Sequence, residues 1–203
     1  MHKITSLVLT ATLLGGCAAA PSAITTPEQA IAQVSAPFSQ GAITLEVQTS
    51  PDLNALEGIA NSCTLLVIQA QHASTLNKLL SSPARLKSLF SAAGAQDEIL
   101  KVDRYAAMPG QSTTLHIDRN ENTRYVAIVA GYYPFPQKQH MVLVAVPVTT
   151  ESQGWWHPTW KATLSPLNLS LLLGTNSINK FSGATQEPVS FTQNDITPSG
   201  KGG

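Results

Sequence analysis

The feature that most constrains this chain is a series of short β-patterned segments between residues 42 and 181. Residues 43–49 alternate apolar and polar side chains, which is typical of a half-buried strand. Residues 123–133 form the most hydrophobic segment, which favours a central place in a sheet. Seven or eight such strands with short turns predict a mainly β protein, a two-sheet β-sandwich. The expected strands are residues 43–49, 64–70, 112–118, 123–133, 140–148, 160–164, 167–173 and 177–181.

One stretch inside this region has a different period. Between residues 72 and 100, apolar residues recur at helical spacing. They are Leu76, Leu79, Leu80, Leu86, Leu89 and Phe90. The pair Ser82-Pro83 is typical of a helix start, because proline fits the first helical position. We therefore predict a small helical insertion of two short helices, with Gly94 ending the second.

The N-terminus has the pattern of an export signal. Lys3 precedes an apolar stretch at residues 4–14, and Leu-Gly-Gly then leads into Cys17, which resembles a bacterial lipobox. The stretch is too short to span a bilayer, which needs about 20 apolar residues. We expect residues 1–16 to be a lipoprotein signal peptide and Cys17 to carry the lipid after cleavage. The alternative is an ordinary secretory signal with a chance cysteine, the mature chain starting near Ala20.

Differences in composition predict three regions after the signal peptide: a tether, a folded domain and a tail. Residues 17–40 are rich in small and polar residues, so we interpret them as the lipidated cysteine and a flexible tether, with a helical turn at residues 27–32. Residues 41–181 are the expected β-sandwich domain. Residues 182–203 are polar and rich in Gly, Ser, Pro and Gln, which predicts a disordered C-terminal tail.

Charge and cysteine content exclude some functions. Only 12% of the residues are charged and the formal net charge is zero, whereas about 25% charged residues is usual. A nucleic-acid partner is not predicted, because it would require a basic patch. If Cys17 is lipidated, Cys63 has no disulfide partner, and its apolar neighbours predict a buried, unreactive thiol.

No motif in the chain is typical of an enzyme. The five histidines show no His-x-x-x-His spacing, so a metal site is not predicted. The pair Asp97-Glu98 fits surface charge better than acid–base catalysis, because adjacent side chains rarely face one another. Nucleophile-elbow, phosphate-loop and dinucleotide motifs are missing from the sequence. We therefore predict a protein that is not an enzyme and has no cofactor and no small-molecule substrate.

Two aromatic groups leave an alternative function open. One is Tyr132-Tyr133 with Phe135, and the other is Trp155-Trp156 in an expected loop at residues 150–158. Such rings either cap the sandwich core or anchor a bound molecule, since Trp and Tyr dominate binding hot spots. The alternative is an envelope lipoprotein that binds a small ligand or glycan through these aromatic loops.

The order of motifs resembles the TssJ family of type VI secretion lipoproteins. The resemblance is carried by Met108-Pro109-Gly110, the strand at residues 112–118 and the run Thr-Arg-Tyr that opens residues 123–132. Ser-Pro-Asp-Leu-Asn at residues 50–54 and the hairpin pattern at residues 169–178 fit the same family. The chain departs from the family after the central strand, where Pro134-Phe135-Pro136 replaces a common Trp, so we expect a divergent member.

The resemblance implies a transthyretin-like sandwich, lipid-anchored on the periplasmic face of the outer membrane. It also implies binding to the periplasmic C-terminal domain of the inner-membrane protein TssM, within a complex that contains TssL. In that family the connection between the first two strands contacts TssM. Here the corresponding residues are Asp52, Leu53, Asn54, Ala55, Leu56, Glu57, Gly58, Ile59, Ala60 and Asn61.

The residues of this connection support the same expectation independently. Leu53, Leu56 and Ile59 are apolar although connections usually lie at the surface. Exposed apolar side chains on a protruding loop suit an interface. The alternative is that these side chains fold back onto the sandwich.

Overall fold

The structure is a computed structural model that describes residues 24–91 and 98–191. The expected signal peptide, Cys17, Gly94, Asp97 and the last part of the expected tail lie outside the described residues. The strands are β1 (Ser39–Thr49), β2 (Cys63–Ala70), β3 (Ile99–Ala107), β4 (Ser112–Arg119), β5 (Tyr125–Ala130), β6 (Met141–Ala145), β7 (Val148–Gln153), β8 (Thr159–Leu164), β9 (Leu167–Leu173) and β10 (Ile178–Ser182). The helices are α1 (Pro27–Ala32), α2 (Ala73–Leu80) and α3 (Pro83–Phe90), with a 3₁₀ turn at Lys138–His140.

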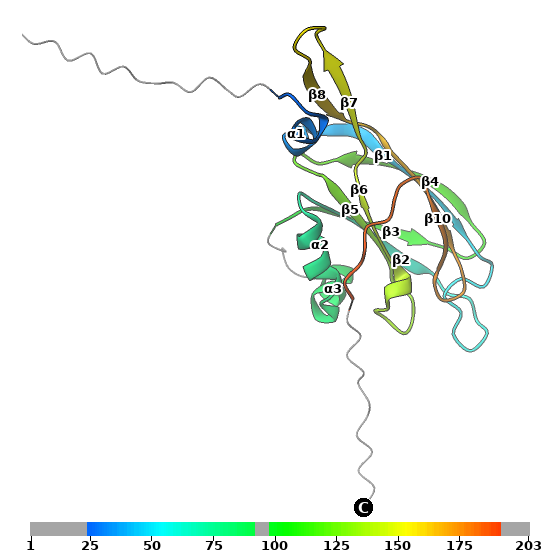
Figure 1. The fold of residues 1–203 in the computed structure, drawn as a ribbon. Helices are drawn as coiled ribbons and strands as arrows, with labels where there is room; N and C mark the ends of the chain where they lie inside the picture. The colour runs from blue at the N-terminus through cyan, green and yellow to red at the C-terminus, as the bar shows by residue number, and fades with distance from the viewer. Residues whose placement is uncertain (1–23, 92–97, 192–203) are drawn as a thin grey trace, which may run out of the picture.

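Two four-stranded sheets pack face to face (Figure 1). One has the order β10-β9-β1-β4, and β1 is antiparallel to β4 but parallel to β9. The other has the order β3-β2-β5-β6 and is antiparallel throughout. Strands β7 and β8 form a separate hairpin. The predicted two-sheet β-sandwich with a helical insertion is confirmed.

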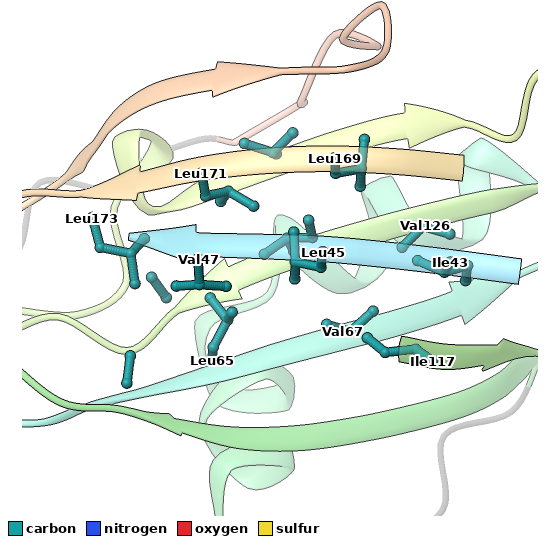
Figure 2. Close-up of a cluster of buried hydrophobic side chains, with 14 of the residues drawn as sticks. Ile43, Leu45, Val47, Leu65, Val67, Ile117, Val126, Leu169, Leu171 and Leu173 are labelled. Atoms are coloured by element: carbon teal, nitrogen blue, oxygen red, sulfur yellow. The ribbon is translucent and has the colours of Figure 1, made fainter. Parts of the chain in front are cut away.

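The main core lies between the two sheets (Figure 2). Leu45 and Val47 of β1 point inward and are at most 5% exposed, while Glu46 between them faces out, as the alternation predicts. They meet Leu65 and Val67 of β2, which are also buried. Full burial of each such side chain stabilises the fold by about 1.5–3 kcal/mol.

A second core covers the outer face of the β2 sheet. The α2–α3 insertion packs Leu76 and Leu86 against Leu66 and Ile68 of β2, all of them fully buried. Strand β2 is therefore buried on both faces, which explains why its sequence is almost continuously apolar instead of alternating.

The largest differences from the predicted strands concern β3, β6 and β7. Strand β3 was not predicted, because it is an edge strand with charged residues and mostly half-buried side chains. Strand β6 ends at Ala145, before Pro147, whereas one strand was expected over residues 140–148. The expected loop at residues 150–158 begins with β7, which continues to Gln153 and pairs with β8.

The N-terminal segment before β1 is packed in part. The predicted helical turn is confirmed as α1, which packs against the β7–β8 hairpin. Arg124 donates hydrogen bonds to the carbonyl oxygens of Ile31 (3.1 Å) and Val34 (3.4 Å). Residues 24–38 therefore belong to the folded domain, although they were predicted to be part of the tether.

The C-terminal segment after β10 is also packed where the structure describes it. The backbone N–H of Glu187 donates to the carbonyl oxygen of Leu143 at 2.8 Å, and Gln186 bridges to Val144. Residues 186–187 thus cover the free edge of β6, whereas a disordered tail was predicted from residue 182. No helix within residues 24–91 and 98–191 combines the length and hydrophobicity required to cross a membrane.

Candidate partner-binding loop

Four connections gather at one end of the sandwich, where β1, β3, β5 and β9 finish (Figure 1). The β1–β2 connection is hydrogen-bonded to each of the other three. These bonds join Gly110 N to Ser50 O (3.1 Å), Tyr133 N to Asn54 Oδ1 (2.9 Å) and Thr175 Oγ1 to Asp52 Oδ2 (2.6 Å). The predicted partner-binding residues, Asp52 to Asn61, therefore form a supported loop, which we call the 52–61 loop.

The tip of the 52–61 loop is a small hairpin. Leu56 and Ile59 exchange both of their backbone hydrogen bonds, each at 3.0 Å. Between them, Glu57 (φ 52°) and Gly58 (φ 81°) both have positive φ, which matches a type I′ turn. The geometry fixes the direction in which the tip side chains project.

Burial separates the three apolar residues of the loop. Leu53 is 0% exposed and joins the main core, whereas Leu56 is 50% exposed and Ile59 is 69% exposed. Asn61 N donates to the Leu53 carbonyl oxygen at 2.9 Å and closes the base of the loop. Leu53 therefore folds back onto the sandwich, and Leu56 and Ile59 remain available for contact.

Two more exposed apolar side chains lie on the neighbouring connections. Met108 in the β3–β4 turn is 45% exposed, and Tyr133 after β5 is 68% exposed. Neither residue was predicted to bind the partner. Their position could have been inferred only from the pairing of β3 and β5 with β2, which brings their ends beside the start of that strand.

Hydrogen bonds hold the polar groups at this end in fixed positions. The Ser50 and Thr175 hydroxyls donate to Asp52, and these bonds lower the pKa of its carboxyl group. The Tyr132 hydroxyl donates to the carbonyl oxygen of Ser177 at 2.8 Å. The end of the sandwich is thus a connected surface built from several strand connections.

The two aromatic groups considered for ligand binding lie far apart. Tyr132 is 1% exposed and belongs to the main core. Trp155 and Trp156 are 90% and 86% exposed at the tip of the β7–β8 hairpin, at the opposite end of the sandwich (Figure 1). A ligand or glycan site that combines both groups is therefore not formed by the described residues.

Reactive groups are scattered over the described part of the chain. Within it, no three or more His, Cys, Asp or Glu side chains are grouped so that they could hold a metal ion. Cys63 is 1% exposed, as predicted, and burial raises the pKa of its thiol to about 11. Glu98 accepts a hydrogen bond from Thr75 at 2.9 Å.

Fold and site together define a β-sandwich module with exposed apolar connections at one end. The sequence profile of the type VI secretion lipoproteins, which include VasD, EvfM and TssJ, matches residues 41–165. The chain belongs to this family, so the predicted resemblance to TssJ is confirmed.

Several solved structures from type VI secretion systems are similar to this chain. The lipoprotein TssJ1 from Pseudomonas aeruginosa is 18% identical, with a TM-score of 0.49 over 76% of this chain and 99% of that chain. Lip from Serratia marcescens, a membrane-bound component of the system, is 15% identical, with a TM-score of 0.49 over 70% of this chain and 96% of that chain. A chain from a structure described as the TssM C-terminal domain from EAEC is 14% identical, with a TM-score of 0.46 over 72% of this chain and 98% of that chain. No curated protein matches this sequence.

Proposed function

We propose that this protein is an outer-membrane lipoprotein that anchors a type VI secretion membrane complex by binding the periplasmic C-terminal domain of TssM. The lipid on Cys17 holds it at the periplasmic face of the outer membrane, and TssL belongs to the same complex. Its role is tethering, without catalysis. The observation that carries the proposal is the pair Leu56 and Ile59, exposed at the tip of a supported loop.

The positions of the two attachment points support this proposal. The carbonyl oxygen of Ile24, the first described residue, accepts a hydrogen bond from Trp160 N at 2.9 Å, beside the β7–β8 hairpin. The 52–61 loop lies at the other end of the sandwich (Figure 1). Strand β1 runs between the two ends and is hydrogen-bonded on both sides. A load between membrane and partner would pass along this central strand.

Burial of the exposed loop tip by a partner would contribute favourable free energy to binding. A Leu or Ile side chain contributes about 1.5–3 kcal/mol when it is transferred from full exposure to full burial. Leu56 and Ile59 retain half or more of that surface for a partner. Because the type I′ turn already fixes the tip, little additional conformational freedom is lost on docking.

Binding of the full-length protein to the TssM periplasmic region tests the proposal. We expect Leu56→Asp and Ile59→Asp each to raise the Kd at least about tenfold, since a charge would be buried at the interface. Phe38→Asp is the matched control, because Phe38 is 58% exposed but precedes β1 at the other end.

The outcomes separate the two parts of the proposal. Unchanged binding by both loop variants, with Phe38→Asp also unchanged, would show that the 52–61 loop is not the site. A folded wild-type protein that does not bind at micromolar concentration would contradict TssM as the partner.

A further inference from the structure

The β7–β8 hairpin projects from the sandwich and carries the most exposed large apolar side chains of the described residues (Figure 1). Trp155 and Trp156 are adjacent, at 90% and 86% exposure. A buried Trp removes about 150–250 Å² from water, so two exposed rings leave a large unfavourable surface uncovered. The hairpin tip therefore has the exposed apolar surface that is typical of a contact site.

The path of the chain places the hairpin on the membrane side of the molecule. Trp160 N donates to Ile24 O at 2.9 Å, and Ile24 follows Cys17 by seven residues. Seven residues span at most about 25 Å. Trp156 precedes Trp160 by four residues, which span at most about 14 Å. The Trp pair is therefore within reach of the surface to which the lipid on Cys17 attaches.

The chemistry of the tip suits the boundary between lipid headgroups and acyl chains. Trp favours this zone because its ring is apolar and its N–H can still be hydrated. Residues 152–159 contain only one ionisable side chain, His157. The nearest charged residues, Glu151 and Lys161, are cross-strand partners further from the tip. Shallow insertion would thus bury no carboxylate or ammonium group.

We propose that Trp155 and Trp156 insert into the same leaflet that holds the lipid on Cys17, as a second membrane contact. The inference rests on the lipid anchor of the proposed function. Because α1 packs against both strands of the hairpin, this contact restricts rotation of the sandwich about its lipid. It directs the 52–61 loop away from the membrane and toward the periplasm.

Fluorescence quenching tests the contact. The full-length, lipidated protein is reconstituted into vesicles of phosphatidylethanolamine and phosphatidylglycerol, with and without brominated phosphatidylcholine as the quencher. We expect strong quenching of wild-type Trp fluorescence. The double variant Trp155→Ser/Trp156→Ser, which retains Trp160, should lose most of it. Trp160→Phe, which retains the tip pair, should keep it.

Each result has a defined meaning, because mass spectrometry of the same sample reports the lipid on Cys17. An acylated protein that is not quenched, or whose double variant is quenched as strongly as wild type, overturns the membrane contact and leaves the anchor intact. A protein without acyl groups contradicts the anchor itself and, with it, this inference. Shielding of the Trp pair by added TssM, without quenching by lipid, would assign the tip to the protein partner and overturn the membrane contact.

Discussion

His140 shows how one buried side chain joins two connections at the loop end. Its Nε2 lies 3.0 Å from the carbonyl oxygen of Asn176, and its ring stacks against Phe135 at a centroid distance of 6.3 Å. The side chain is 1% exposed, and Nδ1 has no hydrogen-bond partner within the described residues. Burial lowers the pKa of His140, although the bond to Asn176 opposes this shift. The neutral ring is therefore part of the folded state.

Acid should destabilise the domain through this residue. Since the pKa of His140 is lower in the folded state, the unfolded chain takes up the proton first as the pH falls below about 6.5. The stabilisation is fully present above that pH and is lost on acidification. We expect the melting temperature, followed by circular dichroism, to fall between about pH 7 and pH 5. His140→Gln should flatten this dependence, and an unchanged slope in that variant would assign the effect to other groups.

At the residue scale, sequence patterns identified the apolar positions of the loop but did not predict which of them are buried and which are exposed. Leu53, Leu56 and Ile59 have the same chemical character and similar spacing. The backbone separates them: Leu53 lies at the base, where the chain closes onto the core, whereas the other two flank a turn with positive φ. The bridge between Leu56 and Ile59 closes that turn locally, whereas the burial of Leu53 depends on its contact with residues of the main core that are distant in sequence.

A substitution at Gly58 tests whether the turn conformation at the tip of the 52–61 loop is required for binding. Gly58 has φ +81°, and a β-branched residue in this region of backbone space costs about 1–3 kcal/mol. We expect Gly58→Val to distort the tip and weaken TssM binding by up to about tenfold. The global melting temperature should change little, because the tip contributes nothing to the core. The measurement is an affinity titration with the TssM periplasmic region.

Glu57→Gly is the matched control for that experiment. Glu57 also has positive φ, at 52°, so glycine relieves strain there and keeps the turn. This variant should bind as wild type does. Equal affinities for Gly58→Val and wild type would show that the turn conformation is not required.

At the element scale, strands were predicted best where one or both faces of the strand are completely buried. Strands β1, β2 and β9 follow the predicted patterns closely. Strand β3 was missed because its charged residues hide the strand pattern. These residues have partners in the fold: Lys101 pairs with Asp103 at 3.2 Å, and Arg104 Nε donates to the carbonyl oxygen of Leu89 at 2.6 Å. The packed residues after β10 were missed because they show no alternating pattern: backbone hydrogen bonds attach residues 186–187 to β6, and only the isolated side chains of Val189 and Phe191 pack against the second core.

At the scale of the whole molecule, the two ends have different surfaces. One end carries α1, the β7–β8 hairpin and the entry of the chain, and the other carries the 52–61 loop (Figure 1). The sequence indicated the 52–61 loop as a partner contact and Trp155-Trp156 as part of an alternative ligand site, but not the separation of the two ends. That separation arises because β1 crosses the full length of its sheet, which only the strand pairing reveals.

Removal of the lipid should separate folding from function. The described residues of both packed cores lie at position 43 and beyond, so we expect Cys17→Ser to leave the melting temperature unchanged. The variant should move from the membrane fraction to the soluble periplasmic fraction, and type VI secretion should be lost. The measurements are fractionation and a secretion assay in the native host. Full secretion by the variant would mean that lipid anchoring is dispensable.

Hydrogen–deuterium exchange of the full-length protein, alone and with the TssM periplasmic region, reports which end of the sandwich binds the partner. We expect slower exchange of the amides in residues 52–61 and at Tyr133 when the complex forms. Amides of the β7–β8 hairpin, which face the membrane in this account, should exchange as in the free protein. A complex that protects the hairpin and leaves residues 52–61 unchanged would contradict it.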